Sequence, residues 1–70
     1  MNWNEEAYRL IRREMVRRKM TYAKLAEKLV AMGVQETPKS IANKVSRGSF
    51  SFVFFIQCMR ALEVEKVDIV

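Results

Sequence analysis

Hydrophobic residues recur every three or four positions along most of the chain, which is the period of an amphipathic helix. Asn2 and Glu5 have the spacing of a capping box, in which a side-chain oxygen accepts a hydrogen bond from a free amide of the first turn. The pattern therefore predicts a first helix that begins near Asn2. Its apolar stripe consists of Trp3, Ala7, Leu10, Ile11 and Met15.

Two shorter helices are predicted in the middle of the chain, because each of their ends carries a recognisable signal. Thr21 is a suitable N-cap for the first of them, and Gly33 is a suitable left-handed residue to end it. Thr37 and Pro38 begin the second, since proline at the first helical position sacrifices no hydrogen bond, and Gly48 ends it. The apolar stripe of the first helix of this pair consists of Ala23, Leu25, Ala26, Leu29, Val30 and Met32.

The second helix of the pair has a polar outer face. Ile41, Ala42 and Val45 face inward in this pattern, and no acidic residue occurs between Pro38 and Gly48. Cationic, amide and hydroxyl side chains are the groups that bind the phosphates and base edges of nucleic acid. The alternative interpretation is an ordinary solvated helix surface. The outer face consists of Lys39, Ser40, Asn43, Lys44 and Arg47.

The segments MTYAKLAEKL, IANKVSRG and ALEV together resemble helix-turn-helix domains of the lambda-repressor and Cro type. The resemblance covers about residues 7–64. It implies an all-α compact bundle of about four short helices, with the motif at residues 21–48. It also implies double-stranded DNA as the partner, with the second motif helix in the major groove and a homodimer on a two-fold site. The chain is similar, too, to short bacterial domains of unassigned function, which implies no activity.

The chain departs from the helix-turn-helix pattern at several positions. Tyr22 stands where the family often has a glutamine that contacts DNA, and the turn within residues 33–40 is longer than the family's tight turn. Met15 and Ser46 occupy positions at which many members bury an arginine against a glutamate. The absence of both charged residues together is physically consistent, because one buried charge without the other would be costly. Glu63 replaces the expected glycine. These departures affect the geometry of DNA binding more than the fold.

The formal charge of +5 is unevenly distributed. Residues 1–20 carry six basic and three acidic groups, residues 21–48 five and two, and residues 49–70 two and three. A positive field over the first two-thirds of the chain favours a polyanionic partner. Local pairing with glutamates is the alternative for the arginines of the first helix. The predicted DNA-binding residues are Tyr22, Lys24, Lys39, Ser40, Asn43, Lys44 and Arg47, with Arg17, Arg18 and Lys19 before the motif.

The stretch after Gly48 predicts a fourth helix that begins after Ser49 or Ser51 and runs to about Leu62. Its apolar residues are too many for one stripe, which indicates contact with a second copy of the chain or another protein. Alternatively, the phenylalanines of SFSF form a loop that covers the open end of the core. The last seven residues, VEKVDIV, predict a short extended tail, whose edge could pair with a partner. The predicted partner interface is Phe52, Phe54, Phe55, Val67 and Ile69.

Little in the sequence favours catalysis. Histidine is absent, and the two glycines are far apart, so the sequence has neither the usual general base nor a Gly-rich phosphate loop. All eight acids are expected on exposed faces or turns, and the single cysteine, Cys58, is expected to act as a small hydrophobic residue. We therefore expect one domain over residues 1–70, no enzyme, and no cofactor, metal or small-molecule ligand. The absence of long apolar runs and of a cysteine framework favours a cytoplasmic protein without a membrane segment or signal peptide.

Three functional hypotheses follow. The first is a small DNA-binding transcriptional regulator that uses the helix after Pro38. The second is a protein–protein interaction module of the same fold that acts through the phenylalanine-rich fourth helix. The third is RNA binding, which the sequence favours least because it lacks a sheet platform of stacking aromatic residues.

Overall fold

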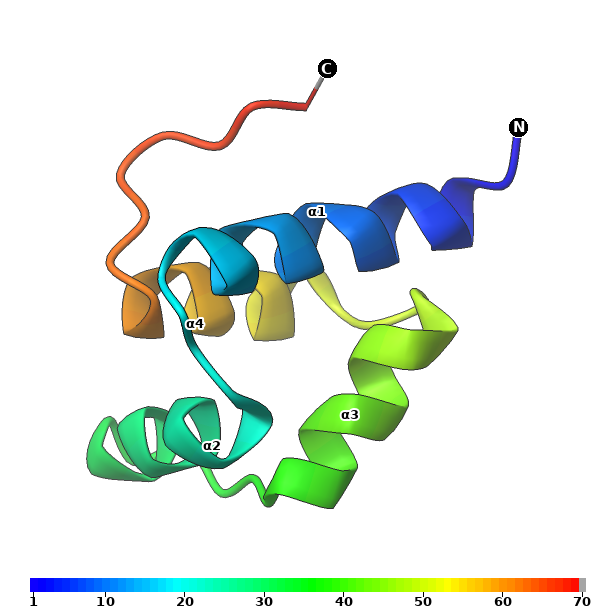
Figure 1. Ribbon diagram of the computed structural model, residues 1–70. Coiled ribbons are helices and arrows are strands. Elements are labelled where there is room, and N and C mark those ends of the chain that lie inside the picture. The colour runs from blue at the N-terminus through cyan, green and yellow to red at the C-terminus, as the bar shows by residue number, and fades with distance from the viewer. Residues whose placement is uncertain (70) are drawn as a thin grey trace.

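The computed structural model describes residues 1–69, and within them it contains four α-helices and no strand (Figure 1). The helices are α1 (Trp3–Arg17), α2 (Tyr22–Ala31), α3 (Pro38–Arg47) and α4 (Phe52–Ala61). The predicted all-α bundle of four short helices is therefore confirmed.

Each helix begins after a side chain that caps its first turn. The four N-caps accept a hydrogen bond from the amide three residues later, and they are Asn2, Thr21, Thr37 and Ser51. Thr37 forms a complete capping box, because the Ser40 hydroxyl accepts a hydrogen bond from the Thr37 amide in return. Asn2 forms only half of one, since the Glu5 carboxylate pairs with Arg9 instead. The predicted helix starts are thus confirmed, and Ser51 rather than Ser49 caps the fourth helix.

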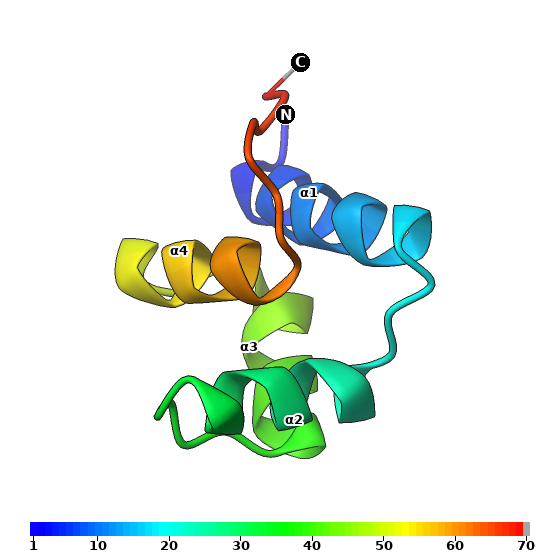
Figure 2. The same cartoon turned by 90° about the vertical axis from the view of Figure 1, so that its left-hand side faces the viewer.

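The helices enclose one apolar core. Helix α2 lies on the opposite side of the core from α1 and α4, and α3 runs steeply from the level of α2 to that of α1 (Figures 1 and 2). Helix α3 packs against both α1 and α2, and α2 also packs against α4. All four helices contribute fully buried side chains, namely Ile11, Met15, Leu25, Leu29, Ile41, Val45 and Cys58.

At the chain ends, one expectation is wrong and the predicted short extended tail is not confirmed in the described residues. Trp3 was expected in the apolar stripe of α1, but it is 74% exposed in the first turn of that helix. The segment after α4 runs back toward α1 without forming a strand (Figure 1). The Arg13 guanidinium donates a hydrogen bond to the carbonyl oxygen of Asp68 in this segment. Val70, which belongs to the predicted tail, lies outside the described residues.

Gly48 ends α3 at a position where a side chain does not fit. Its φ of +67° lies in the left-handed region, and a Cβ atom there would lie 1.9 Å from the carbonyl oxygen of Asn4. Gly33 follows α2 with a φ of +86°, but nothing lies within 4 Å of its hypothetical Cβ. The absence of a side chain at Gly48 therefore lets the end of α3 approach the backbone of α1.

The pair of glycines yields a matched test. Gly33→Ala should lower the free energy of unfolding by about 1–2 kcal/mol, which is the cost of a left-handed conformation for an L-residue. Gly48→Ala should lower the free energy of unfolding by the same amount and by about 1–3 kcal/mol more, because of the clash with Asn4. Urea denaturation of both variants measures the difference. Equal losses would contradict the close approach of α3 to α1.

Candidate functional site

Helix α3 has one face in the core and another in solvent. Ile41 and Val45 are fully buried. Apart from Pro38 in the first turn, the exposed side chains of α3 fall, at about 100° per residue, within about a third of the helix circumference on the opposite side. These exposed residues are Lys39, Asn43, Ser46 and Arg47.

Three of these residues surround a shallow hollow on the surface. Asn43, Ser46 and Arg47 line it, and the Arg47 Nε donates a hydrogen bond to the carbonyl oxygen of Asn43 at 3.3 Å. The hollow is therefore bordered by an amide, a hydroxyl and a guanidinium group. Such groups are suited to bind anionic oxygens and the polar edges of bases.

Exposed cations also occur close to the start of α2. Lys19 and Lys24 are exposed, as are Lys39 and Arg47 of α3. Within residues 1–69, none of these four side chains forms an ion pair with a carboxylate. Their positive charge is therefore not neutralised by a neighbouring acid of the protein.

Glu36, in the turn before α3, binds two of the residues predicted to contact DNA. Its carboxylate accepts a hydrogen bond from the Ser40 hydroxyl at 2.6 Å and forms an ion pair with Lys44. The Glu36 side chain is only 6% exposed. The Lys44 Nζ also lies 4.9 Å from the centroid of the Phe54 ring. Ser40 and Lys44 are thus occupied by contacts within the protein, and their pairing with Glu36 was not predicted from the sequence.

The environment of Glu36 favours its ionised form. Burial raises the pKa of the Glu36 carboxyl, but the hydrogen bonds from Lys44 and Ser40 and the charge of Lys44 outweigh burial, so the pKa lies below its ordinary value. Burial, together with the charge of Glu36, raises the pKa of the Cys58 thiol to about 12. Cys58 is therefore protonated at neutral pH and acts as a small buried hydrophobic residue.

A second buried carboxylate binds the arginines at the end of α1. Glu14 was expected on an exposed face, and this is wrong, because it is 2% exposed. Arg18 lies 2.6 Å, Arg17 3.2 Å and Arg13 3.3 Å from its carboxylate oxygens. Burial raises the pKa of Glu14. The hydrogen bonds from Arg18 and Arg13 and the charges of Arg17 and Arg18 outweigh burial, so the pKa lies below its ordinary value. Two predicted phosphate ligands, Arg17 and Arg18, are thus paired with an internal acid.

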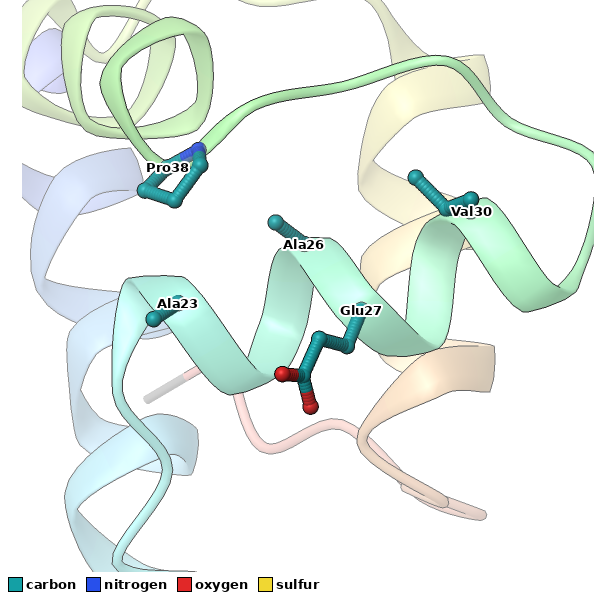
Figure 3. A pocket seen from close by; sticks show the side chains of 5 residues that line it. All are labelled: Ala23, Ala26, Glu27, Val30 and Pro38. Atoms are coloured by element: carbon teal, nitrogen blue, oxygen red, sulfur yellow. The ribbon is translucent and has the colours of Figure 1, made fainter.

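An apolar groove lies beside α2, next to the start of α3 (Figure 3). Tyr22 is half-buried at the start of the helix, with the Arg12 guanidinium 5.1 Å from its ring centroid. In Figure 3, Pro38 of α3 lies across from the alanines of α2, and the Glu27 carboxylate points away from it. The connection between α2 and α3 therefore leaves an apolar hollow beside α2. It is lined by Ala23, Ala26, Glu27, Val30 and Pro38.

The predicted partner interface is divided between the surface and the core. Phe54 is buried, whereas Phe52 is 73% exposed and stacks on the half-buried Phe55, with ring centroids 6.1 Å apart. Val53 and Ile56, which the prediction did not include, are 64% and 48% exposed. In the segment after α4, Val67 is half-buried and Ile69 is exposed.

The described residues contain no cluster of three or more His, Cys, Asp or Glu side chains that could hold a metal ion. Nor does the described part of the chain contain a helix long and apolar enough to cross a membrane.

Residues 3–67 match a known protein family, described as Domain of unknown function (DUF6471). The match includes all four helices. The expected similarity to short domains of unassigned function is thereby confirmed. A comparison with curated proteins found no match, and a comparison with solved structures also found none.

The Glu36 contacts predict a change in how stability depends on pH. Because its pKa is lowered in the folded state, its contribution is present above the unfolded pKa, about 4.3, and is lost as the pH falls through the folded pKa. Glu36→Gln should therefore reduce stability at neutral pH by about 1–3 kcal/mol and flatten the decline of stability below pH ~5. Urea denaturation across this pH range measures both effects.

Glu27→Gln is the control, because Glu27 is exposed and forms no ion pair within residues 1–69. It should retain the pH dependence of the original protein. A Glu36→Gln profile parallel to that of the original protein would show that Glu36 is not held by Lys44 and Ser40.

Proposed function

We propose that this chain, which belongs to the DUF6471 family, is a small DNA-binding regulator that inserts α3 into the major groove. The observation that carries the proposal is the solvent face of α3, where Lys39, Asn43, Ser46 and Arg47 lie together without an acidic neighbour on that helix. The major groove admits an α-helix, and phosphates and base edges bind cationic and amide side chains.

The relation of α2 to α3 supports the same function. In helix-turn-helix proteins the second helix lies in the major groove while the first crosses the backbone. Here α3 crosses α2 steeply (Figure 2), and Lys24 and Lys19 are exposed at the start of α2 and just before it. In the proposed complex these two lysines bind phosphates.

Within α3 the residues take different roles. Asn43 suits adenine, which an amide can bind through two hydrogen bonds, and Lys39 suits guanine, whose major-groove edge offers two acceptors. Arg47, at the end of the helix, binds a phosphate. Ser40 and Lys44 position α3 through Glu36 and contribute less to the interface. Arg17 and Arg18 similarly remain bound to Glu14.

Duplex DNA binding should depend on salt and on the face of α3. If Lys19, Lys24 and Arg47 each neutralise one phosphate, the logarithm of affinity should fall with log salt at a slope of about −2.7 per subunit. Fluorescence anisotropy with labelled random duplexes measures this slope, and Lys39→Glu/Arg47→Glu should abolish binding at near-physiological salt.

The matched control is Lys28→Glu/Arg60→Glu, which changes the net charge equally but lies outside α3. It should retain most of the affinity. A slope near zero, or equal losses in the two double variants, would refute DNA binding through α3.

The outer face of α4 favours a second candidate function, which is self-association. Phe52, Val53 and Ile56 occupy one side of this helix and are all at least 48% exposed. No charged residue occurs from Gly48 to Met59. In a chain with a net charge of +5, this face can therefore meet a second copy without like-charge repulsion. Large exposed apolar side chains in a cluster are typical of interaction sites.

Self-association predicts a dimer that depends on α4. Sedimentation equilibrium should show a monomer–dimer equilibrium for the original protein and a monomer for Phe52→Ser/Ile56→Ser. Val16→Ser should leave the equilibrium unchanged, because Val16 is an exposed apolar residue of α1. A protein that stays monomeric at every concentration, or a variant that still dimerises, would exclude this candidate.

A further inference from the structure

A second groove lies where α2 and α4 end. Its lining residues are Lys28, Ala31, Met32, Arg60 and Ala61. In Figure 1 the C-terminal ends of α2 and α4 are on the left of the molecule, whereas α3 is on the right. The groove is therefore separate from the solvent face of α3.

The groove combines apolar and cationic lining residues. The apolar ones are Ala31, Ala61 and Met32, and Met32 is 42% exposed. Methionine is flexible and polarisable, so its side chain can adapt to different apolar partners. The cationic lining residues, Lys28 and Arg60, are exposed, and within residues 1–69 neither forms an ion pair.

Helix dipoles account for only part of this arrangement. Lys28 and Arg60 lie in the last turns of α2 and α4, where a positive charge is favourable. The dipoles do not require an exposed apolar side chain in the same groove as the two cations. That combination matches a ligand with the opposite pattern, which is an apolar side chain flanked by carboxylates.

We propose that this groove binds an acidic amphipathic segment of another protein. An apolar side chain of the segment packs on Met32, and its flanking carboxylates pair with Lys28 and Arg60. A second copy of this chain fits less well, because its net charge is also +5. Nucleic acid offers phosphates for the two cations but no aliphatic side chain for the methionine. Because the groove and α3 lie on different sides, both can be occupied at once.

Three synthetic peptides of equal length test the proposal, with the sequences EELLEELLEE, QQLLQQLLQQ and KKLLKKLLKK. Each is titrated into the isotope-labelled full chain and followed by two-dimensional NMR. The acidic peptide should shift the amide signals of Lys28, Met32 and Ala61 in a saturable manner. The neutral peptide should bind at least about tenfold more weakly, and the basic peptide should not bind.

Two double variants of equal charge separate this groove from the general positive field. Lys28→Glu/Arg60→Glu should weaken binding of the acidic peptide at least about tenfold, whereas Lys39→Glu/Arg47→Glu should preserve it. If the first variant does not fold, as judged from its NMR spectrum, Lys28→Gln/Arg60→Gln replaces it. Absence of binding by the acidic peptide, or equal losses in both variants, would overturn the proposal.

The same variants keep this inference distinct from DNA binding. Failure of DNA binding leaves the peptide result unchanged, because the peptide experiment contains no DNA. Failure of peptide binding likewise leaves the DNA titration unaffected, since DNA is proposed to contact α3.

Discussion

The buried carboxylate of Glu36 acts together with the buried side chains of α3 to hold one side of that helix toward solvent. It holds Ser40 and Lys44 toward the turn, and Lys44 in turn lies over the ring of Phe54 in α4. Removing Lys44 would leave the buried Glu36 charge without its ion-pair partner, which is costly. Together with Ile41 and the rest of the apolar core, this contact fixes the rotation of α3. The remaining cationic and amide side chains of the helix are then presented on one exposed face.

Local signals in the sequence were sufficient to predict the helices. Capping side chains, Pro38 and the terminal glycines act within one turn of the backbone, so Thr21, Thr37 and Gly48 could be assigned without tertiary information. Burial of acids could not be predicted in this way. The contact between Glu36 and Lys44 spans eight residues and a turn, which no helical spacing rule covers.

For Glu14, the spacing to Arg17 and Arg18 does indicate pairing, since residues three and four apart are neighbours on a helix. That spacing does not reveal that the carboxylate is buried. The charge count of the sequence therefore overstated the number of free cations among the predicted DNA-binding residues. Within residues 1–69, Lys19, Lys24, Lys39 and Arg47 form no ion pair, whereas Lys44, Arg17 and Arg18 do. Three surfaces of different chemistry result: a cationic face on α3, an uncharged face on α4 and a mixed groove between the ends of α2 and α4.

The most direct test of the account is NMR mapping of the isotope-labelled protein with a short duplex DNA. If α3 enters the major groove of the DNA, the largest changes in amide shift should occur at Lys39, Asn43 and Arg47, with smaller changes at Lys24. The amides near Arg60 should remain unchanged. Changes confined to α4, or no changes at saturating DNA, would contradict the central claim that the solvent face of α3 is the functional surface of this domain.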